Sequence, residues 1–139
     1  MKYKIVSFDI FDTLLKRDVF FPTDVFVLVE REYNRRFGQQ LNFATIRENA
    51  EKVARDKSQY QDVTFDEIYS EINLSVSEKN ILKQLELDAE SSLLHSNIEV
   101  QYLFEECLKS GKTIYLVSDM YLPKNFLERI LKREAISGY

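Results

Sequence analysis

Two short stretches of the sequence carry acids and hydroxyls at spacings that suit ligand chemistry. Asp9, Asp12 and Thr13 follow one apolar run, and Ser118 and Asp119 follow another far downstream. Carboxylates and hydroxyls are groups that attack a ligand, exchange protons with it or hydrogen-bond it. If the two runs are neighbouring parallel strands, these groups meet in one crevice at the carboxyl edge of a sheet. The alternative is that Asp9 and Asp12 only cap the turn after the first strand.

Both apolar runs have the composition of strands in an open α/β sheet. Residues 4–9 and 113–117 are rich in β-branched and aromatic side chains. The first run is apolar on both faces, which predicts a parallel strand covered by helices on each side. A helix between about 98 and 111 is the predicted crossover of a right-handed βαβ unit, and Pro123 predicts the start of a last helix. The predicted crossover helix carries Ile98, Tyr102, Leu103, Cys107 and Leu108.

Between the two runs the apolar residues repeat with a helical period. Gly38 predicts the end of the first helix. Thr64 with Glu67, and Ser75 with Glu78, fit capping boxes that begin two further helices. We therefore expect four helices between about 22 and 94 that pack through four stripes, namely Val25, Phe26, Val29, Tyr33 and Phe37; Phe43, Ile46, Ala50 and Val53; Phe65, Ile68 and Ile72; and Ile81, Leu82, Leu85, Ala89 and Leu93.

Composition excludes several classes of function. The 139 residues are 45% apolar, with ten Phe and eight Tyr, which is ample for a core. The net charge of −4 argues against a nucleic-acid partner, because such surfaces need clustered basic residues. The single cysteine, Cys107, predicts a buried thiol and no intrachain disulfide. No run approaches the ~18 apolar residues of a membrane span, so we expect a cytoplasmic chain without a membrane partner.

The residues at the two strand ends resemble the motifs of a known superfamily. Residues 8–15, FDIFDTLL, resemble the first motif of the haloacid dehalogenase-like (HAD) hydrolases, and residues 117–120, VSDM, resemble their second. The sequences FDIFDTLL and VSDMYLP, at residues 8–15 and 117–123, are particularly similar to those of one branch of this superfamily. Members of that branch are found alone or fused to glycosyltransferases in bacterial surface-polysaccharide loci. The resemblance covers both ends of the chain and leaves the helical segment between them.

This resemblance implies a phosphatase mechanism. Asp9 would be the nucleophile that forms an aspartyl-phosphate with a small phosphate monoester. Thr13 and Ser118 would bind the phosphoryl oxygens, with Asp119 beside them. The implied cofactor is Mg²⁺, held by the Asp9 carboxylate and the main-chain carbonyl of Phe11, because a carboxylate and a phosphoryl group repel each other. The helical segment would act as a lid over the substrate.

Phe11 departs from the family pattern and opens alternatives. The family usually has an Asp at this position, which protonates the leaving alkoxide, and general acid catalysis is typically worth ~10²–10⁴-fold. Asp12 is an auxiliary candidate, although adjacent side chains near a strand end point to opposite faces, and Asp119 is another. Haloacid dehalogenases carry an aromatic residue here, because a halide leaves without a proton. A metal-independent 2-haloacid dehalogenase and a non-catalytic phosphate-binding or interaction module therefore stay open.

The predicted architecture is α/β with an interrupted core. Residues 1–18 and 97–139 are expected to form a partial Rossmann-like core, and residues 19–96 an all-helical cap inserted after the first strand. His95, near the return junction, is expected to be a hinge or surface residue. The family's Lys motif and its acidic fourth motif have no counterpart in this sequence. We therefore expect an amino-terminal piece of a longer hydrolase, with reduced or no activity, or a homodimer that covers the open sheet edges.

Overall fold

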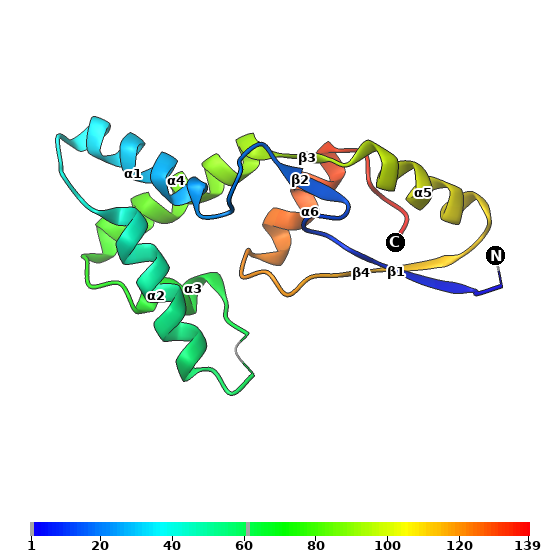
Figure 1. Cartoon of the computed structure of the whole chain (residues 1–139), viewed down its shortest axis with the longest axis horizontal. Coiled ribbons are helices and arrows are strands. Elements are labelled where there is room, and N and C mark those ends of the chain that lie inside the picture. Colours follow the sequence, from blue (N-terminus) through cyan, green and yellow to red (C-terminus); the bar gives the residue numbers. More distant parts are fainter. Residues whose placement is uncertain (1, 61) are drawn as a thin grey trace. The chain divides into compact units, whose positions relative to one another are not determined.

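The chain has a mixed α/β fold in which helices predominate, as predicted (Figure 1). A computed structural model describes residues 2–60 and 62–139. The elements in chain order are β1 (Ile5–Asp9), β2 (Leu15–Arg17), α1 (Asp24–Phe37), α2 (Phe43–Lys57), α3 (Phe65–Ser70), α4 (Val76–Leu93), β3 (Leu94–Ser96), α5 (Ile98–Lys109), β4 (Thr113–Val117) and α6 (Lys124–Arg133).

Contacts divide the described chain into two compact units, and each unit is discontinuous in sequence. The predicted insert 19–96 overlaps most of the second unit, but residues 94–96 belong to the first, because they form a strand there. A short segment after β4 belongs to the second unit, which the sequence did not indicate. Unit 1 consists of residues 2–18, 94–120 and 124–139, and unit 2 consists of residues 19–93 and 121–123.

Unit 1 is built on the parallel pair of β1 and β4. The register runs from Ile5 opposite Thr113 to Asp9 opposite Val117. One face of the pair packs on α5, where the rings of Phe8 and Phe104 meet edge-on with centroids 5.5 Å apart. The predicted parallel pairing is therefore confirmed, and so is the burial of Cys107, which lies in the same core.

The opposite face of this sheet is exposed, and the prediction of strands buried on both faces is wrong. Ile5 is 61% exposed, and Tyr115 and Val117 are each 58% exposed. Successive side chains of a strand point to opposite faces, so covering one side buries only alternate residues such as Phe8 and Ile114. The sequence shows that both faces are apolar, but among the described residues only one face is covered.

A second, antiparallel pair in unit 1 was not predicted. β2 and β3 pair with Lys16 opposite His95, at the two points where the chain leaves for unit 2 and returns. His95 is half-exposed, and its Nε2 lies 2.8 Å from Oδ1 of Asp18. Arg133, at the end of α6, donates to the main-chain oxygen of Leu94 at 2.6 Å. Local sequence gives no signal for this pair, because each strand is three residues long and its partner is distant in the chain.

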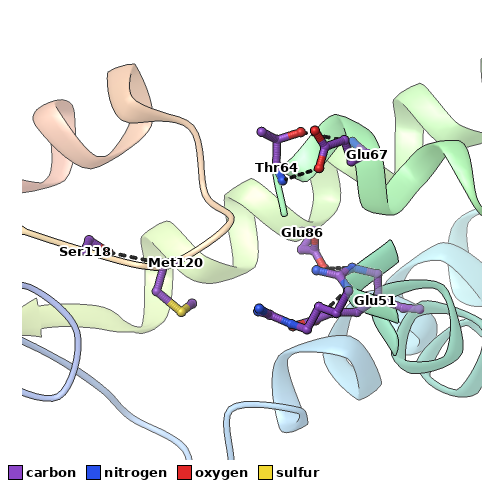
Figure 2. Close-up of polar contacts among 8 residues, drawn as sticks. Glu51, Thr64, Glu67, Glu86, Ser118 and Met120 are labelled. Carbon is purple, nitrogen blue, oxygen red and sulfur yellow. Dashed lines mark hydrogen bonds and ion pairs between the residues drawn. The ribbon is translucent and has the colours of Figure 1, made fainter. Parts of the chain in front are cut away.

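Unit 2 contains the four predicted helices, α1 to α4. Gly38 ends α1 in the left-handed region, with φ 58°, and its N–H bonds the main-chain oxygen of Asn34, as a helix stop requires. The capping box of Thr64 and Glu67 is present at the start of α3, and both of its hydrogen bonds are drawn in Figure 2. The matching pair of bonds between Ser75 and Glu78 begins α4. These boundary predictions are confirmed.

The predicted packing stripes are right in part. In α1, Phe37 is 46% exposed although the rest of its stripe is buried. In α2, the buried positions are Phe43, Arg47, Ala50 and Ala54, and Val53 is 41% exposed. The stripe is thus rotated by about one position, because Arg47 takes the place that the apolar pattern gave to Ile46. In α5, the predicted residues Ile98, Tyr102 and Leu103 are exposed, whereas Phe104 is buried.

None of the helices in the described residues is both long enough and apolar enough to span a lipid bilayer. This agrees with the sequence, in which charged residues interrupt every apolar stretch. The longest helix, α4, has 18 residues and begins with the acidic Glu78 in its first turn.

Candidate active site at the carboxyl ends of β1 and β4

The strand register brings the two polar stretches to the same edge of the sheet. Asp9 is the last residue of β1 and lies opposite Val117, the last residue of β4. The N–H of Ile10 also donates to the main-chain oxygen of Val117 at 3.2 Å, so the pairing continues one residue beyond β1. Ser118 follows Val117 directly. The sheet therefore places the backbone of Asp9 next to the strand end that presents Ser118.

The chain after β1 turns back on itself and returns Thr13 to Asp9. Main-chain N–H groups of Leu14 and Leu15 donate to the oxygens of Asp9 and Ile10 at 3.4 and 2.8 Å. Asp12 makes this possible with a left-handed φ of 58°, a conformation that Asp tolerates better than most residues. As a result, Oγ1 of Thr13 lies 3.4 Å from Oδ2 of Asp9 and donates to it.

The side chain of Phe11 is packed inside unit 1. It is 6% exposed, and the guanidinium carbon of Arg17 lies 4.9 Å from its ring centroid. An apolar ring under a cation has no proton to give, so Phe11 offers a ligand only its main-chain carbonyl. Asp12 is exposed in the turn, and its role as an auxiliary acid stays a prediction.

The turn after β4 orients the hydroxyl of Ser118. The N–H of Met120 donates to Oγ of Ser118 at 3.2 Å, and Figure 2 shows this short closed turn. Because Oγ accepts this bond, its own O–H proton stays available for an acceptor on a ligand. Ser118 is half-buried, and Asp119 is exposed beside it.

The two turns are rich in negative charge, which bears on what they can bind. Asp9, Asp12 and Asp119 are all exposed. A phosphate would be repelled by these carboxylates unless a cation lay between them. The Asp9 carboxylate and the Phe11 carbonyl are the hard oxygen donors that Mg²⁺ prefers, and Mg²⁺ commonly takes its remaining ligands from phosphate and water. The residues present thus fit part of a magnesium site, although no group of three His, Cys, Asp or Glu in the described chain is placed to hold a metal alone.

A second polar cluster lies inside unit 2, and sequence reasoning missed it. Arg47, Glu86 and Glu90 are fully buried. Nε of Arg47 lies 2.7 Å from Oε1 of Glu86, and Nη1 of Arg47 lies 3.0 Å from Oε2 of Glu51. Figure 2 labels Glu51 and Glu86 and draws these two ion pairs as dashed lines. We call Arg47, Glu51, Glu86 and Glu90, together with Tyr69 and Tyr121, the Arg47 cluster.

Burial sets the ionisation of the Arg47 cluster. Burial raises the pKa of Glu86 to about 7, against the opposing effect of the Arg47 guanidinium. Burial also disfavours the charge on Arg47, but the nearby carboxylate of Glu86 and that of Glu51 hold the pKa of Arg47 above its ordinary value. The pKa values of Tyr69 and Tyr121 are raised, first by burial and then by the charge of Glu86. The one signal available in the sequence was Arg47 itself, four residues after Phe43 on the buried stripe.

Comparison with known proteins does not assign this chain to a family. No protein-family model matches the sequence, and no curated protein matches it either. The functional assignment therefore depends on the geometry of the two turns and on the residue types that they carry.

Proposed function

We propose that the chain is a HAD-like hydrolase, a Mg²⁺-dependent phosphatase that acts on a small phosphate monoester through an aspartyl-phosphate. The observation that carries this proposal is the register in which Asp9 lies opposite Val117 and Ser118 follows immediately. This mechanism needs a nucleophilic carboxylate and a phosphate-binding hydroxyl at the same edge of the sheet. The sequence resemblance assigned these two roles to the same two residues.

In this mechanism Asp9 performs a double displacement. A carboxylate oxygen of Asp9 attacks phosphorus, the bond from phosphorus to the ester oxygen breaks, and the leaving oxygen takes up a proton. Water then attacks the phosphorus of the aspartyl-phosphate, which releases phosphate and restores the carboxylate. Thr13 lies close enough to Asp9, at 3.4 Å between oxygens, to orient the carboxylate. Ser118 donates its free O–H to a phosphoryl oxygen.

Mg²⁺ would be held by the Asp9 carboxylate and the Phe11 carbonyl, with phosphate and water oxygens completing the shell. When bound, it would supply the positive charge that offsets repulsion between the carboxylate and the phosphate. Because the side chain of Phe11 is buried and apolar, it cannot protonate the leaving group. We therefore expect aryl phosphates, whose leaving groups need little protonation, to be better substrates than alkyl phosphates.

The same observation on Phe11 supports a second candidate, a 2-haloacid dehalogenase. In that reaction Asp9 displaces a halide from carbon to form an ester, and water hydrolyses the ester to give the hydroxy acid. The leaving halide needs no proton, so the lack of a proton donor at position 11 does not slow this reaction. Halide release from 2-chloropropionate that persists in the presence of a chelator would select this reaction instead.

The test is hydrolysis of p-nitrophenyl phosphate by the purified chain in the presence of Mg²⁺. Because the Lys motif and the acidic fourth motif have no counterpart in this sequence, we expect slow phosphate release, which Asp9→Asn lowers by about a thousandfold or more and which a chelator abolishes. Asp56→Asn, at an exposed position of α2, is the matched control and should leave the rate unchanged. If the chain instead binds phosphate without turnover, it is the non-catalytic module and the enzymatic proposal fails.

The auxiliary acid is tested by comparing two substrates. If Asp12 or Asp119 protonates the leaving oxygen, its replacement by Asn should lower hydrolysis of an alkyl phosphate more than that of the aryl phosphate, because only the alkoxide needs the proton. Equal effects on the two substrates would remove both residues from this role.

A further inference from the structure

The face of the β1–β4 sheet opposite α5 is apolar and exposed in the described chain. Ile5 is 61% exposed, and Tyr115 and Val117 are each 58% exposed. The register sets Ser7 of β1 opposite Tyr115 of β4, and alternate residues of a strand point to the same side, so these side chains form one continuous surface. We call this surface the bare face, and its residues are Ile5, Ser7, Thr113, Tyr115 and Val117.

The composition of the bare face favours a contact with protein over a contact with water. None of its side chains is charged. A sheet face that is solvated normally carries polar residues, and parallel strands are normally covered on both faces. A contiguous exposed apolar surface of this kind marks a site of association.

The charges at the two ends of the strands indicate what the bare face binds. Basic residues precede both strands, and acidic residues follow both. Nζ of Lys112 donates to the main-chain oxygen of Tyr3, which joins the starts of the two strands. Glu105 and Glu106, the acids that precede Lys112 in the chain, lie on α5, which covers the other face. The basic residues are Lys2, Lys4 and Lys112, and the acidic residues are Asp9, Asp12 and Asp119.

We propose that the bare face binds the bare face of a second copy of this chain, with the strands of the two copies antiparallel. A twofold axis that passes between the sheets at Ser7 and Tyr115 sets each residue of the surface against the same surface of the partner. It also sets the basic end of each strand pair against the acidic end of the other. Parallel strands would instead bring like charges together, so the charge pattern of one chain is complementary to a reversed copy of itself.

This inference goes beyond the proposed function and does not depend on it. Sedimentation velocity of the purified chain measures the association, and Tyr115→Glu tests the surface, because two carboxylates would then face each other across the axis. Tyr102→Glu is the matched control, since Tyr102 is 65% exposed on α5. We expect a dimer at about 100 µM for the unaltered chain and for Tyr102→Glu, and a dissociation constant raised at least about tenfold in Tyr115→Glu.

Two results would overturn the proposal. The first is an unaltered chain that is a monomer throughout the concentration series. The second is a dimer that Tyr115→Glu leaves intact, because the copies would then meet through another surface, such as a strand edge or the outer side of α5. Circular dichroism checks that each variant is folded. If Tyr115→Glu is not folded, Ile5→Glu replaces it, because it places the same charge on the other strand of the bare face.

Cysteine cross-linking tests the antiparallel orientation. Thr113 and Val117 lie at opposite ends of β4, about 13 Å apart along the strand. With reversed strands, Thr113 of one copy faces Val117 of the other. A short bismaleimide should therefore link Thr113→Cys to Val117→Cys in a mixture of the two variants more than it links either variant to itself. Cys107 is 1% exposed, so the unaltered chain should not be linked. Val117→Cys that links mainly to itself would overturn the orientation.

Charge reversal at the basic end tests the complementarity. Lys4→Glu should raise the dissociation constant of the dimer by about fivefold, because it places a carboxylate against the acidic end of the partner. Lys132→Glu, at an exposed position of α6, is the matched control and should change it by less than about twofold. Equal changes in the two variants would overturn the role of the strand-end charges. None of these measurements needs enzymatic activity, so a chain without phosphatase activity would overturn the proposed function and leave this inference standing.

Discussion

The turns of unit 1 and the Arg47 cluster of unit 2 place ionisable residues in opposite environments. Asp9 and Asp119 lie exposed at strand ends, where a ligand can reach them. Arg47, Glu86 and Glu90 are fully buried, and Arg47 is ion-paired with Glu86 at 2.7 Å. From this difference we infer that exposure at a strand end, and not charge alone, is what makes Asp9 a candidate for ligand chemistry.

The buried cluster also carries an energetic cost that the turns do not have. In the described part of the chain, Nη2 of Arg47 and Oε2 of Glu86 are buried without a hydrogen-bond partner. Each such atom typically costs about 1–3 kcal/mol, and a buried ion pair often adds little net stability over apolar residues. We infer that the cluster fixes side-chain positions in unit 2 more than it stabilises the fold.

The largest expected effect comes from breaking the cluster on one side. Arg47→Met removes the cation and leaves the buried carboxylates uncompensated, so the free energy of unfolding should fall by about 3 kcal/mol or more at pH 8. Urea unfolding followed by circular dichroism measures it. The double variant Arg47→Met with Glu86→Leu should recover most of the loss. A double variant as unstable as the single one would show that the ion pair itself stabilises the unit.

The next effect is a pH dependence of stability that the Arg47 cluster should produce. The folded-state pKa of Glu86, about 7, lies above its ordinary value of 4.5, so between these values the folded chain holds a proton that the unfolded chain has lost. Stability is therefore greatest below the ordinary value and falls as pH rises through 7. We expect a fall of about 2 kcal/mol between pH 5 and 8, which Glu86→Gln should largely remove in urea unfolding.

Glu32→Gln is the matched control for this pH dependence. Hydrogen bonds from Arg35 and Arg36 lower the pKa of Glu32 to about 2. A carboxyl with a lowered pKa contributes stability that is lost only as pH falls below its ordinary value. The slope between pH 5 and 8 should therefore be the same in Glu32→Gln as in the unaltered chain. If Glu32→Gln removed the fall in the free energy of unfolding between pH 5 and 8 and Glu86→Gln kept it, the attribution of this fall to Glu86 would be wrong.

A smaller effect is expected from the local interactions within unit 2 that the sequence does predict. Thr64→Ala deletes the side chain that accepts from the Glu67 N–H at 3.2 Å, and loss of an N-cap typically costs about 1 kcal/mol. Ser75→Ala at the start of α4 should cost a similar amount, since its bond to Glu78 is equally long. Thermal unfolding of both variants checks this. A cost at either cap as large as that of Arg47→Met would remove the contrast between local and long-range interactions.

The smallest expected stability effect is at the catalytic candidate itself. Asp9 is exposed, and its side chain accepts a long hydrogen bond, 3.4 Å, from Thr13. Asp9→Asn should therefore change the free energy of unfolding by less than about 0.5 kcal/mol, although it should abolish phosphatase activity. A loss of stability comparable to that of Arg47→Met would mean that Asp9 caps the turn and has a structural role.

The sequence predicted what short-range patterns determine. The strands that end at Asp9 and Val117, the helix stop at Gly38 and both capping boxes follow from residues within a few positions of one another. It did not predict the pairing of β2 with β3, because three-residue strands have no measurable period and their pairing depends on the long insertion between them.

The Arg47 cluster was missed for a different physical reason. A charged residue on a helix is normally solvated, so the apolar pattern placed Ile46 and Val53 on the buried face of α2 in place of Arg47 and Ala54. Burial of Arg47 depends on the carboxylate of Glu86 from α4 and on rings from three other segments. Such a combination exists only after the helices have packed.

The proposed site is tested most directly by whether Asp9 and Ser118 bind one phosphoryl group. Beryllofluoride mimics a phosphoryl group bound to a carboxylate, and fluorine NMR of the chain with Mg²⁺ reports its binding. We predict a bound signal in the unaltered chain that is absent in Asp9→Asn and about tenfold weaker in affinity in Ser118→Ala. Ser7→Ala, an exposed position on β1, should bind as the unaltered chain does. A bound signal that persists unchanged in Asp9→Asn would contradict the proposed site.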